Sequence, residues 1–220
     1  MNETATPARG RIRVLLVDDH AVVRAGYSTL LKGAPNIDIV AEAGNGMAAV
    51  REFILHNPDV VIMDLSLPDI GGLEAMRRIV ARAADAKVLV FSMHEDIVFV
   101  EQALQAGARG YITKRSAPQV LIEAVQRIAG GDVYLESDIA QRLAIQKTRG
   151  PDTPFIDLST REFEIFCLLA EGLNVNEIAR RLSLSYKTVA NYSTQIKAKL
   201  KVGTVAELAR LAIRHGLVKI

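Results

Sequence analysis

The chain has 220 residues, half of them hydrophobic, which allows one large or two small domains with well-buried cores. Its formal net charge of +2 is unevenly distributed: residues 1–156 carry 17 basic and 19 acidic side chains, whereas residues 157–220 carry 10 and 6. No acidic residue lies between Glu177 and Glu207, a segment that holds six lysines and arginines. A basic C-terminal part of this kind favours a nucleic-acid partner.

The composition also argues against a membrane or secreted protein. No apolar run is long enough to span a bilayer, and the polar N-terminus has no signal-peptide pattern. Cys167 is the only cysteine, so no disulfide forms within the chain, which fits a reducing compartment. We expect Cys167 to be a core residue, because it lies in an apolar helical stretch. The protein is expected to be cytoplasmic and to make no membrane contact.

Short apolar segments alternate with helical patterns through the first 130 residues. Each segment is bounded by turn residues, which is typical of the buried strands of a parallel sheet. This alternation predicts an α/β domain with a doubly wound, five-stranded parallel sheet of the flavodoxin-like order. The expected strands cover residues 11–17, 37–42, 59–64, 87–93 and 108–113, and the expected helices cover residues 21–33, 46–56, 72–83, 96–106 and 117–130.

The chain changes character on either side of this α/β segment. Residues 1–10 are expected to be a disordered tail, and residues 131–156 a linker with a short helix over residues 137–146. From there on the pattern is entirely helical, so residues 157–220 are expected to form a small all-α domain. Its helices are expected over residues 159–171, 175–182, 186–200 and 204–215.

Polar side chains stand at the ends of four expected strands. Asp18 and Asp19 follow the first, Asp64 ends the third, Ser92 follows the core of the fourth, and Lys114 follows the fifth. Chemistry in an open α/β sheet gathers at the carboxyl ends of the strands, so these groups are expected to converge. Taken singly, each has an ordinary explanation as a cap, turn former or solvated side chain. Together they can hold Mg²⁺ and accept a phosphoryl group on a carboxylate.

The C-terminal segment carries the signals of a helix-turn-helix. Ser159 with Glu162 and Asn174 with Glu177 have the spacing of capping boxes, and Ser185 is a candidate cap for the third helix. Apolar residues recur at helical spacing on one face of that third helix: Val189, Tyr192, Ile196 and Leu200. The opposite face is small, polar and basic: Lys187, Ala190, Asn191, Thr194 and Ala198.

A face of this kind suits the major groove of DNA. Asparagine can read adenine, and lysine can contact guanine or a phosphate. Three lysines near the end of the helix are placed for phosphate contact: Lys197, Lys199 and Lys201. The alternative is a solvated face in a small helical bundle.

Three motifs of the α/β segment resemble those of two-component receiver domains. They are Val17-Asp18-Asp19-His20, Met63-Asp64-Leu65-Ser66-Leu67-Pro68-Asp69 and Gly107-Ala108-Arg109-Gly110-Tyr111-Ile112-Thr113-Lys114. The resemblance covers residues 11–130 and implies that Asp64 accepts a phosphoryl group.

The resemblance also implies roles for the residues around Asp64. Asp19 would bind Mg²⁺ directly, Asp18 would assist through water, and the backbone carbonyl of Ser66 would complete the protein ligands. Three further residues match the switch hydroxyl, the switch aromatic and the phosphate-binding lysine: Ser92, Tyr111 and Lys114.

Residues 158–217 resemble the four-helix LuxR-type DNA-binding domain. The landmarks lie at residues 159–162, 168–172, 177–179, 182–185, 187–189 and 199–200. A receiver followed by this domain is the layout of the NarL/FixJ response regulators. By this resemblance Ala190, Asn191 and Thr194 occupy base-reading positions. Tyr192 stands where the family often has histidine, and Ala190 and Thr194 replace longer or basic residues, so direct base readout is expected to be sparse.

The family resemblance implies a two-component transcription regulator that is not an enzyme in the classical sense, apart from removal of its own phosphoryl group. A sensor histidine kinase would phosphorylate Asp64, and phosphorylation would release a recognition helix occluded by the receiver. Dimers would then bind double-stranded DNA, with RNA polymerase as a further partner.

Two other classes of protein compete with this interpretation. A flavoprotein or phosphatase of related fold would need a phosphate-cradling loop after the first strand, where this chain has two repelling aspartates, Asp18 and Asp19. A protein-interaction module would lack the salt-dependent DNA binding that counterion release produces.

Overall fold

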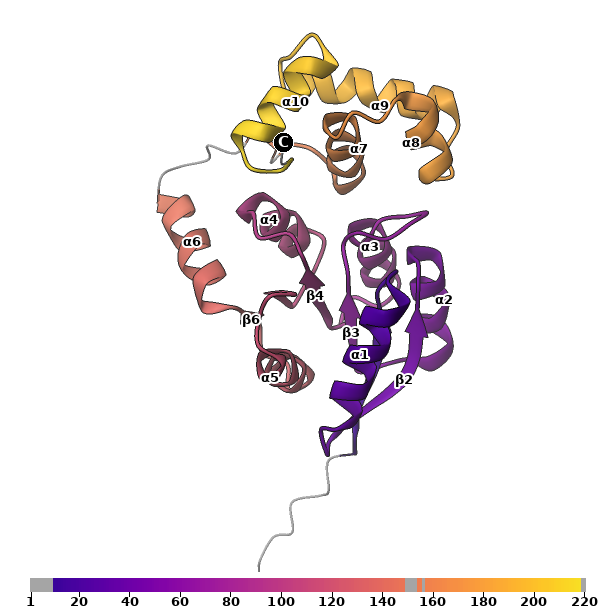
Figure 1. The fold of residues 1–220 in the computed structure, drawn as a ribbon, viewed down its shortest axis with the longest axis vertical. Coiled ribbons are helices and arrows are strands. Elements are labelled where there is room, and N and C mark those ends of the chain that lie inside the picture. Colours follow the sequence, from indigo (N-terminus) through magenta and orange to yellow (C-terminus); the bar gives the residue numbers. More distant parts are fainter. Residues whose placement is uncertain (1–9, 149–153, 156, 219–220) are drawn as a thin grey trace, which may run out of the picture.

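The computed structural model describes residues 10–148, 154–155 and 157–218 (Figure 1). Residues 1–9 of the expected tail and residues 149–153 and 156 of the expected linker lie outside the described residues. The described part comprises a sheet covered by helices, called the N-terminal domain here, and a group of four helices, called the C-terminal domain. Among the described residues, no helix has the length and apolar character needed to cross a membrane.

The sheet of the N-terminal domain is parallel and has the order β2-β1-β3-β4-β5-β6. Its strands are β1 (Ile12–Val17), β2 (Ile37–Ala43), β3 (Val60–Met63), β4 (Val88–Ser92), β5 (Gly110–Thr113) and β6 (Tyr134–Leu135). The first five follow the flavodoxin-like order, so the predicted fold class is confirmed.

The sixth strand corrects the expected count of five. β6 has only two residues, too few for a periodic pattern, and it pairs with Gly110 and Tyr111 of β5. A side chain at Gly110 would overlap the carbonyl oxygen of Tyr134, so glycine lets this strand approach. β6 thus extends the sheet at the start of the expected linker.

Helices cover both faces of the sheet. Alternate residues of β1 show this: Val14 and Leu16 share a core with α1 and α5, while Leu15 and Val17 share a core with α2, α3 and α4. The helices are α1 (Ala21–Lys32), α2 (Gly46–His56), α3 (Gly72–Arg82), α4 (Ile97–Gln105) and α5 (Pro118–Ala129). A further helix, α6 (Ser137–Thr148), packs against α4. Burial on both faces explains why the strands read as continuous apolar runs.

The C-terminal domain is built from α7 (Thr160–Ala170), α8 (Val175–Arg181), α9 (Tyr186–Lys199) and α10 (Val205–Arg214). Both capping boxes expected from the sequence are present, and Ser185 Oγ accepts a hydrogen bond from the Thr188 N–H at the start of α9. Thr204 and Glu207 form another box at α10. The apolar stripe of α9 faces the core, where Val189 and Ile196 are fully buried.

The two domains touch. The C-terminal domain lies over the end of the sheet that carries α3 and α4 (Figure 1), and α7 contacts α3. The Phe99 ring of α4 meets the Phe163 ring of α7 edge to face, with centroids 5.2 Å apart. The amide of Gln102 donates to the Phe155 carbonyl at 3.2 Å. One hydrophobic cluster therefore runs from the sheet into the C-terminal domain.

The aromatic core of the C-terminal domain supports a stability prediction. Phe166 is fully buried and packs 4.9 Å from Phe155 and 6.1 Å from Phe163, measured between ring centroids. We expect Phe166→Ala to lower the free energy of unfolding by about 3–5 kcal/mol, because it removes buried contacts and leaves a cavity. Thermal and denaturant unfolding measure the change. Ile213→Ala, at a 39%-exposed position, is the control, and an equal loss in both variants would contradict the assigned core.

Candidate functional site

Three charged side chains from three strand ends meet at the carboxyl edge of the sheet. Val17 pairs with Met63 in the register, so Asp18 and Asp64, which follow them, lie side by side. The Lys114 ammonium donates to Asp18 Oδ2 and to Asp64 Oδ2, both at 2.6 Å. Both aspartates are almost fully buried. The structure thus brings together the groups that the sequence nominates.

Electrostatics favour the charged form of Lys114 in this cluster. Burial alone would lower the pKa of the Lys114 ammonium, but the hydrogen bonds and charges of Asp18 and Asp64 outweigh it and raise that pKa above its ordinary value. A cation held between two buried carboxylates also offsets their mutual repulsion. Asp64 therefore presents a carboxylate next to a fixed positive charge.

Asp19 occupies a more open position in the same cluster. Its side chain is 30% exposed, and its Oδ1 lies 2.7 Å from His20 Nδ1. One ligand atom from each of Asp18, Asp19 and His20 falls within 4.8 Å of the others, which is a spacing that suits one cation. Oxygen-rich donor sets favour hard cations such as Mg²⁺. Asp69, also close in the sequence, instead caps α2 by accepting from the Gly46 and Met47 N–H groups.

The two expected switch residues lie beneath this cluster. Ser92 and Tyr111 are fully buried on adjacent strands. The Tyr111 hydroxyl donates to the His94 carbonyl at 2.8 Å, and the His94 N–H donates to Ser92 Oγ at 3.3 Å. Burial, with smaller effects from nearby carboxylates, raises the pKa of the Tyr111 phenol well above its ordinary value. Both side chains thus meet the loop that follows β4.

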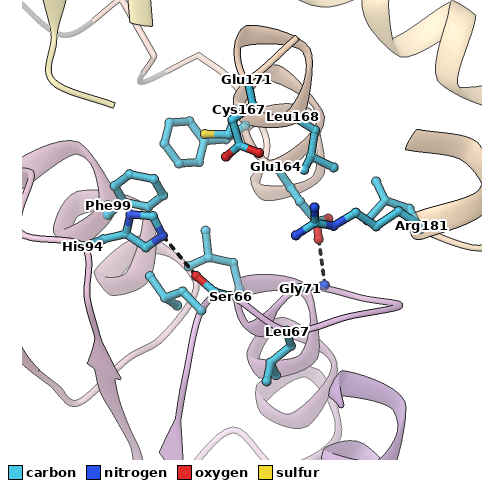
Figure 2. Close-up of a pocket in the computed structure, with 14 residues that line it drawn as sticks. Ser66, Leu67, Gly71, His94, Phe99, Glu164, Cys167, Leu168, Glu171 and Arg181 are labelled. Carbon is cyan, nitrogen blue, oxygen red and sulfur yellow. Dashed lines mark hydrogen bonds between the residues drawn. The ribbon is translucent and has the colours of Figure 1, made fainter. Parts of the chain in front are cut away.

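A pocket connects this loop with the C-terminal domain (Figure 2). His94 Nε2 lies 3.2 Å from Ser66 Oγ, and the His94 ring stacks on Phe99 at 3.9 Å between centroids. On the other side, Glu164 and Cys167 of α7 line the pocket, with Arg181 of α8. Cys167 is buried there, as the sequence predicts. The space between the domains is therefore walled by the loops next to Asp64 and by α7.

Several residues that shape the site carry no sequence signal. Arg24 of α1 donates to the Asp18 carbonyl and pairs with Glu42 of β2, so it holds the main chain of the acidic cluster. His94 and Glu164 are visible only once the fold is known. A lone arginine, histidine or glutamate on a helix or loop reads as solvated, and the contact between Glu164 and Gly71 joins residues 93 positions apart.

The face of α9 nominated for DNA is open to solvent. Lys187, Asn191 and Thr194 are exposed, and Ala190 is half-buried beside them. The N-terminal domain therefore leaves these expected base-reading positions uncovered, whereas the resemblance implies that the receiver occludes them. Docking covers α7 and part of α8 instead.

The lysines at the end of α9 differ in their surroundings. Lys201 is exposed, and Lys197 is half-buried. Lys199 donates to Glu162 Oε2 at 2.6 Å and to the Asp157 carbonyl at 3.0 Å. Burial alone would raise the pKa of the Glu162 carboxyl, but the hydrogen bonds from Lys199 and Ser159 outweigh it and lower that pKa. Phosphate contact by Lys199 thus competes with an internal ion pair.

Comparison with known proteins agrees with this geometry. Residues 14–126 match the family model of the response regulator receiver domain, and residues 157–212 match that of the luxR family of bacterial regulatory proteins. The chain is 43% identical over 208 residues to the response regulator UvrY of Escherichia coli strain K12, covering 94% of this chain and 95% of that protein. It is 38% identical over 209 residues to GacA of Pseudomonas aeruginosa, covering 94% and 98%.

A solved structure shows the same architecture. RcsB from Salmonella enterica serovar Typhimurium, bound to promoter P1flhDC in the presence of the phosphomimetic BeF3⁻, aligns with a TM-score of 0.69 and 25% identity over 92% of this chain and 98% of that one. A carboxylate-bearing parallel sheet followed by a LuxR-type helical domain defines a two-component response regulator. This chain belongs to the NarL/FixJ family of response regulators.

The buried cation generates a prediction about stability. Lys114→Met should lower the free energy of unfolding at neutral pH by about 3–5 kcal/mol, since it leaves two buried carboxylates without a counter-charge. Arg115→Met is the control: its side chain is 59% exposed and pairs with Glu95 at the surface, so the loss should stay below about 1 kcal/mol. Denaturant unfolding of both variants checks this, and equal stabilities would show that Lys114 offsets no buried charge.

Proposed function

We propose that the protein is a transcription regulator controlled by phosphorylation of Asp64. The observation that carries the proposal is the Lys114 ammonium, which bridges buried Asp64 and Asp18 at the sheet edge. A partner sensor histidine kinase would supply the phosphoryl group. An Asp64 carboxylate oxygen would attack phosphorus, the phosphorus–nitrogen bond would break, and the kinase imidazole would leave.

The surrounding side chains fit the product of this transfer. Lys114, whose ammonium donates to Asp64 Oδ2, is proposed to pair with oxygens of the new phosphoryl group, and the buried Ser92 hydroxyl is proposed to hydrogen-bond one of them. Any later loss of the phosphoryl group would be hydrolysis of the acyl phosphate at Asp64, and the chain needs no classical enzyme activity.

The acidic cluster fits a bound Mg²⁺. The carboxylates of Asp18, Asp19 and Asp64 and the backbone carbonyl of Ser66 would hold it, and it would offset charge on the transferred group. The partly exposed Asp19 is open to direct ligation, whereas Lys114 already occupies one oxygen of Asp18. This difference supports direct binding by Asp19 and assistance through water by Asp18.

The switch is proposed to act on contacts made by α4. Here α4 is occupied by its own chain: α6 packs against it, and Phe99 meets Phe163 of α7. A phosphoryl group that draws Ser92 and Tyr111 towards it would shift the loop after β4 and loosen these contacts. The freed face would then support a homodimer, and the C-terminal domains would separate from the receivers.

The proposed function assigns a role to each segment of the chain. We propose a tail over residues 1–10, a receiver domain over 11–130, a linker over 131–156 and a DNA-binding domain over 157–220. Double-stranded DNA, RNA polymerase and the kinase are the proposed partners, in the cytoplasm. RcsB was solved bound to a promoter, which supports the DNA partner for this fold.

Asp64 is proposed as the sole phosphoacceptor. Incubation with a small phosphodonor and Mg²⁺ should add one phosphoryl group to each chain, detected by mass, and sedimentation should show dimers. Asp64→Asn should gain neither, because an amide cannot form the acyl phosphate. Asp69→Asn is the matched control, since its side chain caps α2. Undiminished labelling of Asp64→Asn would contradict the assignment.

DNA binding is proposed to divide between reading and positioning. Asn191 is exposed on the polar face of α9, so Asn191→Ala should weaken binding to the cognate site by about 1–3 kcal/mol and leave random DNA nearly unaffected. The proposed DNA face also includes residues on the same helix and just after it: Lys187, Ala190, Thr194, Lys197, Lys199 and Lys201.

The control for the positioning role is Lys201→Ala. It should weaken cognate and random binding alike and shallow the salt dependence by about one unit. It is a cleaner test than Lys199→Ala, which also removes the ion-pair partner of Glu162. Titrations on both DNAs at several salt concentrations separate the two roles, and equal losses for Asn191→Ala on both DNAs would exclude base reading.

A further inference from the structure

One hydrogen bond between the domains reaches the loop that carries the acceptor site. The Gly71 N–H donates to Glu164 Oε1 at 2.7 Å (Figure 2). Gly71 is the N-cap of α3, and no side-chain hydrogen bond of its own caps that helix. The side chain of Glu164 is only 13% exposed, and Arg161 pairs with its other oxygen. A carboxylate suits a helix N-terminus, so α7 supplies the cap that α3 lacks.

The start of α3 rests directly on the main chain of Asp64. The Gly72 N–H donates to the Leu65 carbonyl at 3.0 Å. A side chain at Gly72 would overlap the Asp64 carbonyl oxygen, so these two backbones are in close contact. The loop of residues 65–71, which includes Ser66, is therefore tied to Asp64 at one end and to Glu164 at the other.

We propose that Glu164 is a positioning residue for phosphoryl transfer to Asp64: from the C-terminal domain, it holds the loop over residues 65–71 in the resting geometry. This rests on the proposed function of Asp64. In the proposed function Lys114 pairs with the phosphoryl group and the Ser66 carbonyl binds the cation, and the proposal is that the loop shifts to allow both. A loop fixed at Gly71 resists this shift. Binding at the phosphoryl site and formation of the Glu164–Gly71 contact are therefore thermodynamically linked. If the contact weakens binding by a given factor, binding weakens the contact by the same factor.

Gly71 provides a variant that breaks the contact from the other side. Its backbone (φ −63°, ψ 163°) is extended and accessible to alanine without strain. A methyl group there would nevertheless overlap Glu164 Oε1. Gly71→Ala should thus leave the N-terminal domain intact and prevent docking of Glu164. Glu164→Gln, which keeps an oxygen acceptor for the Gly71 N–H, is the matched conservative variant of Glu164→Ala.

Two readouts on the full chain test the proposal. Calorimetric titration with BeF3⁻ and Mg²⁺ measures occupancy of the phosphoryl site, and maleimide labelling of Cys167, which is buried in the pocket between the domains, measures opening. Glu164→Ala and Gly71→Ala should each bind BeF3⁻ about fivefold more tightly, at the lower end of typical coupling between sites. Both should label faster, and Glu164→Gln should lie between Glu164→Ala and the wild type.

The double variant decides whether both changes break one contact. Glu164→Ala combined with Gly71→Ala should match either single variant, because the second change has nothing left to remove. Unchanged BeF3⁻ affinity in both single variants, with the wild type binding normally, would overturn the positioning role even if labelling rises. Unchanged labelling of Cys167 in both single variants would show that the Glu164–Gly71 contact does not hold the domains together. A wild type that binds no BeF3⁻ and takes up no phosphoryl group would instead contradict the function proposed for Asp64, and this inference with it.

Discussion

Two buried carboxylates at adjacent strand ends are tolerable only with a cation between them. Asp18 and Asp64 are nearly inaccessible to water, and Lys114 touches both. Two desolvated like charges would otherwise repel each other. The three strand ends are therefore held together by these charges as well as by the backbone hydrogen bonds of the sheet. In the proposed function, a phosphoryl group at Asp64 adds negative charge beside Lys114, and the loops that hold these residues are the ones expected to respond.

The loops that carry Ser66 and His94 are also the ones on which the C-terminal domain rests. Ser66 and His94 touch each other, and the His94 ring stacks on Phe99, which meets Phe163 of α7. Glu164 holds the far end of the same loop. Only a few side chains thus separate the cluster around Asp64 from the LuxR-type domain. A change at one side reaches the other through direct contacts, without a long path through the fold.

The sequence predicts those features of the fold that depend on residues close together in the chain. The apolar runs that end in Asp18 and Asp64 predict the strands and their common edge, and the stripe of α9 through Val189 and Ile196 predicts which face is buried. β6 escaped prediction because two residues carry no period. The surface through which the domains dock escaped prediction, because Glu164 on a helix has the pattern of a solvated residue. The burial of Glu164 depends on a surface contributed by another part of the chain.

The chemistry of the domain contact makes it responsive. Ring packing between Phe99 and Phe163 favours closure, but Glu164 loses hydration there. This desolvation is the largest influence on the pKa of Glu164 and raises it, although Arg161 and the Gly71 N–H oppose the rise. Closure therefore includes an unfavourable burial of charge next to a favourable apolar contact. The proposal that a phosphoryl group at Asp64 shifts the population of this contact rests on these opposing contributions.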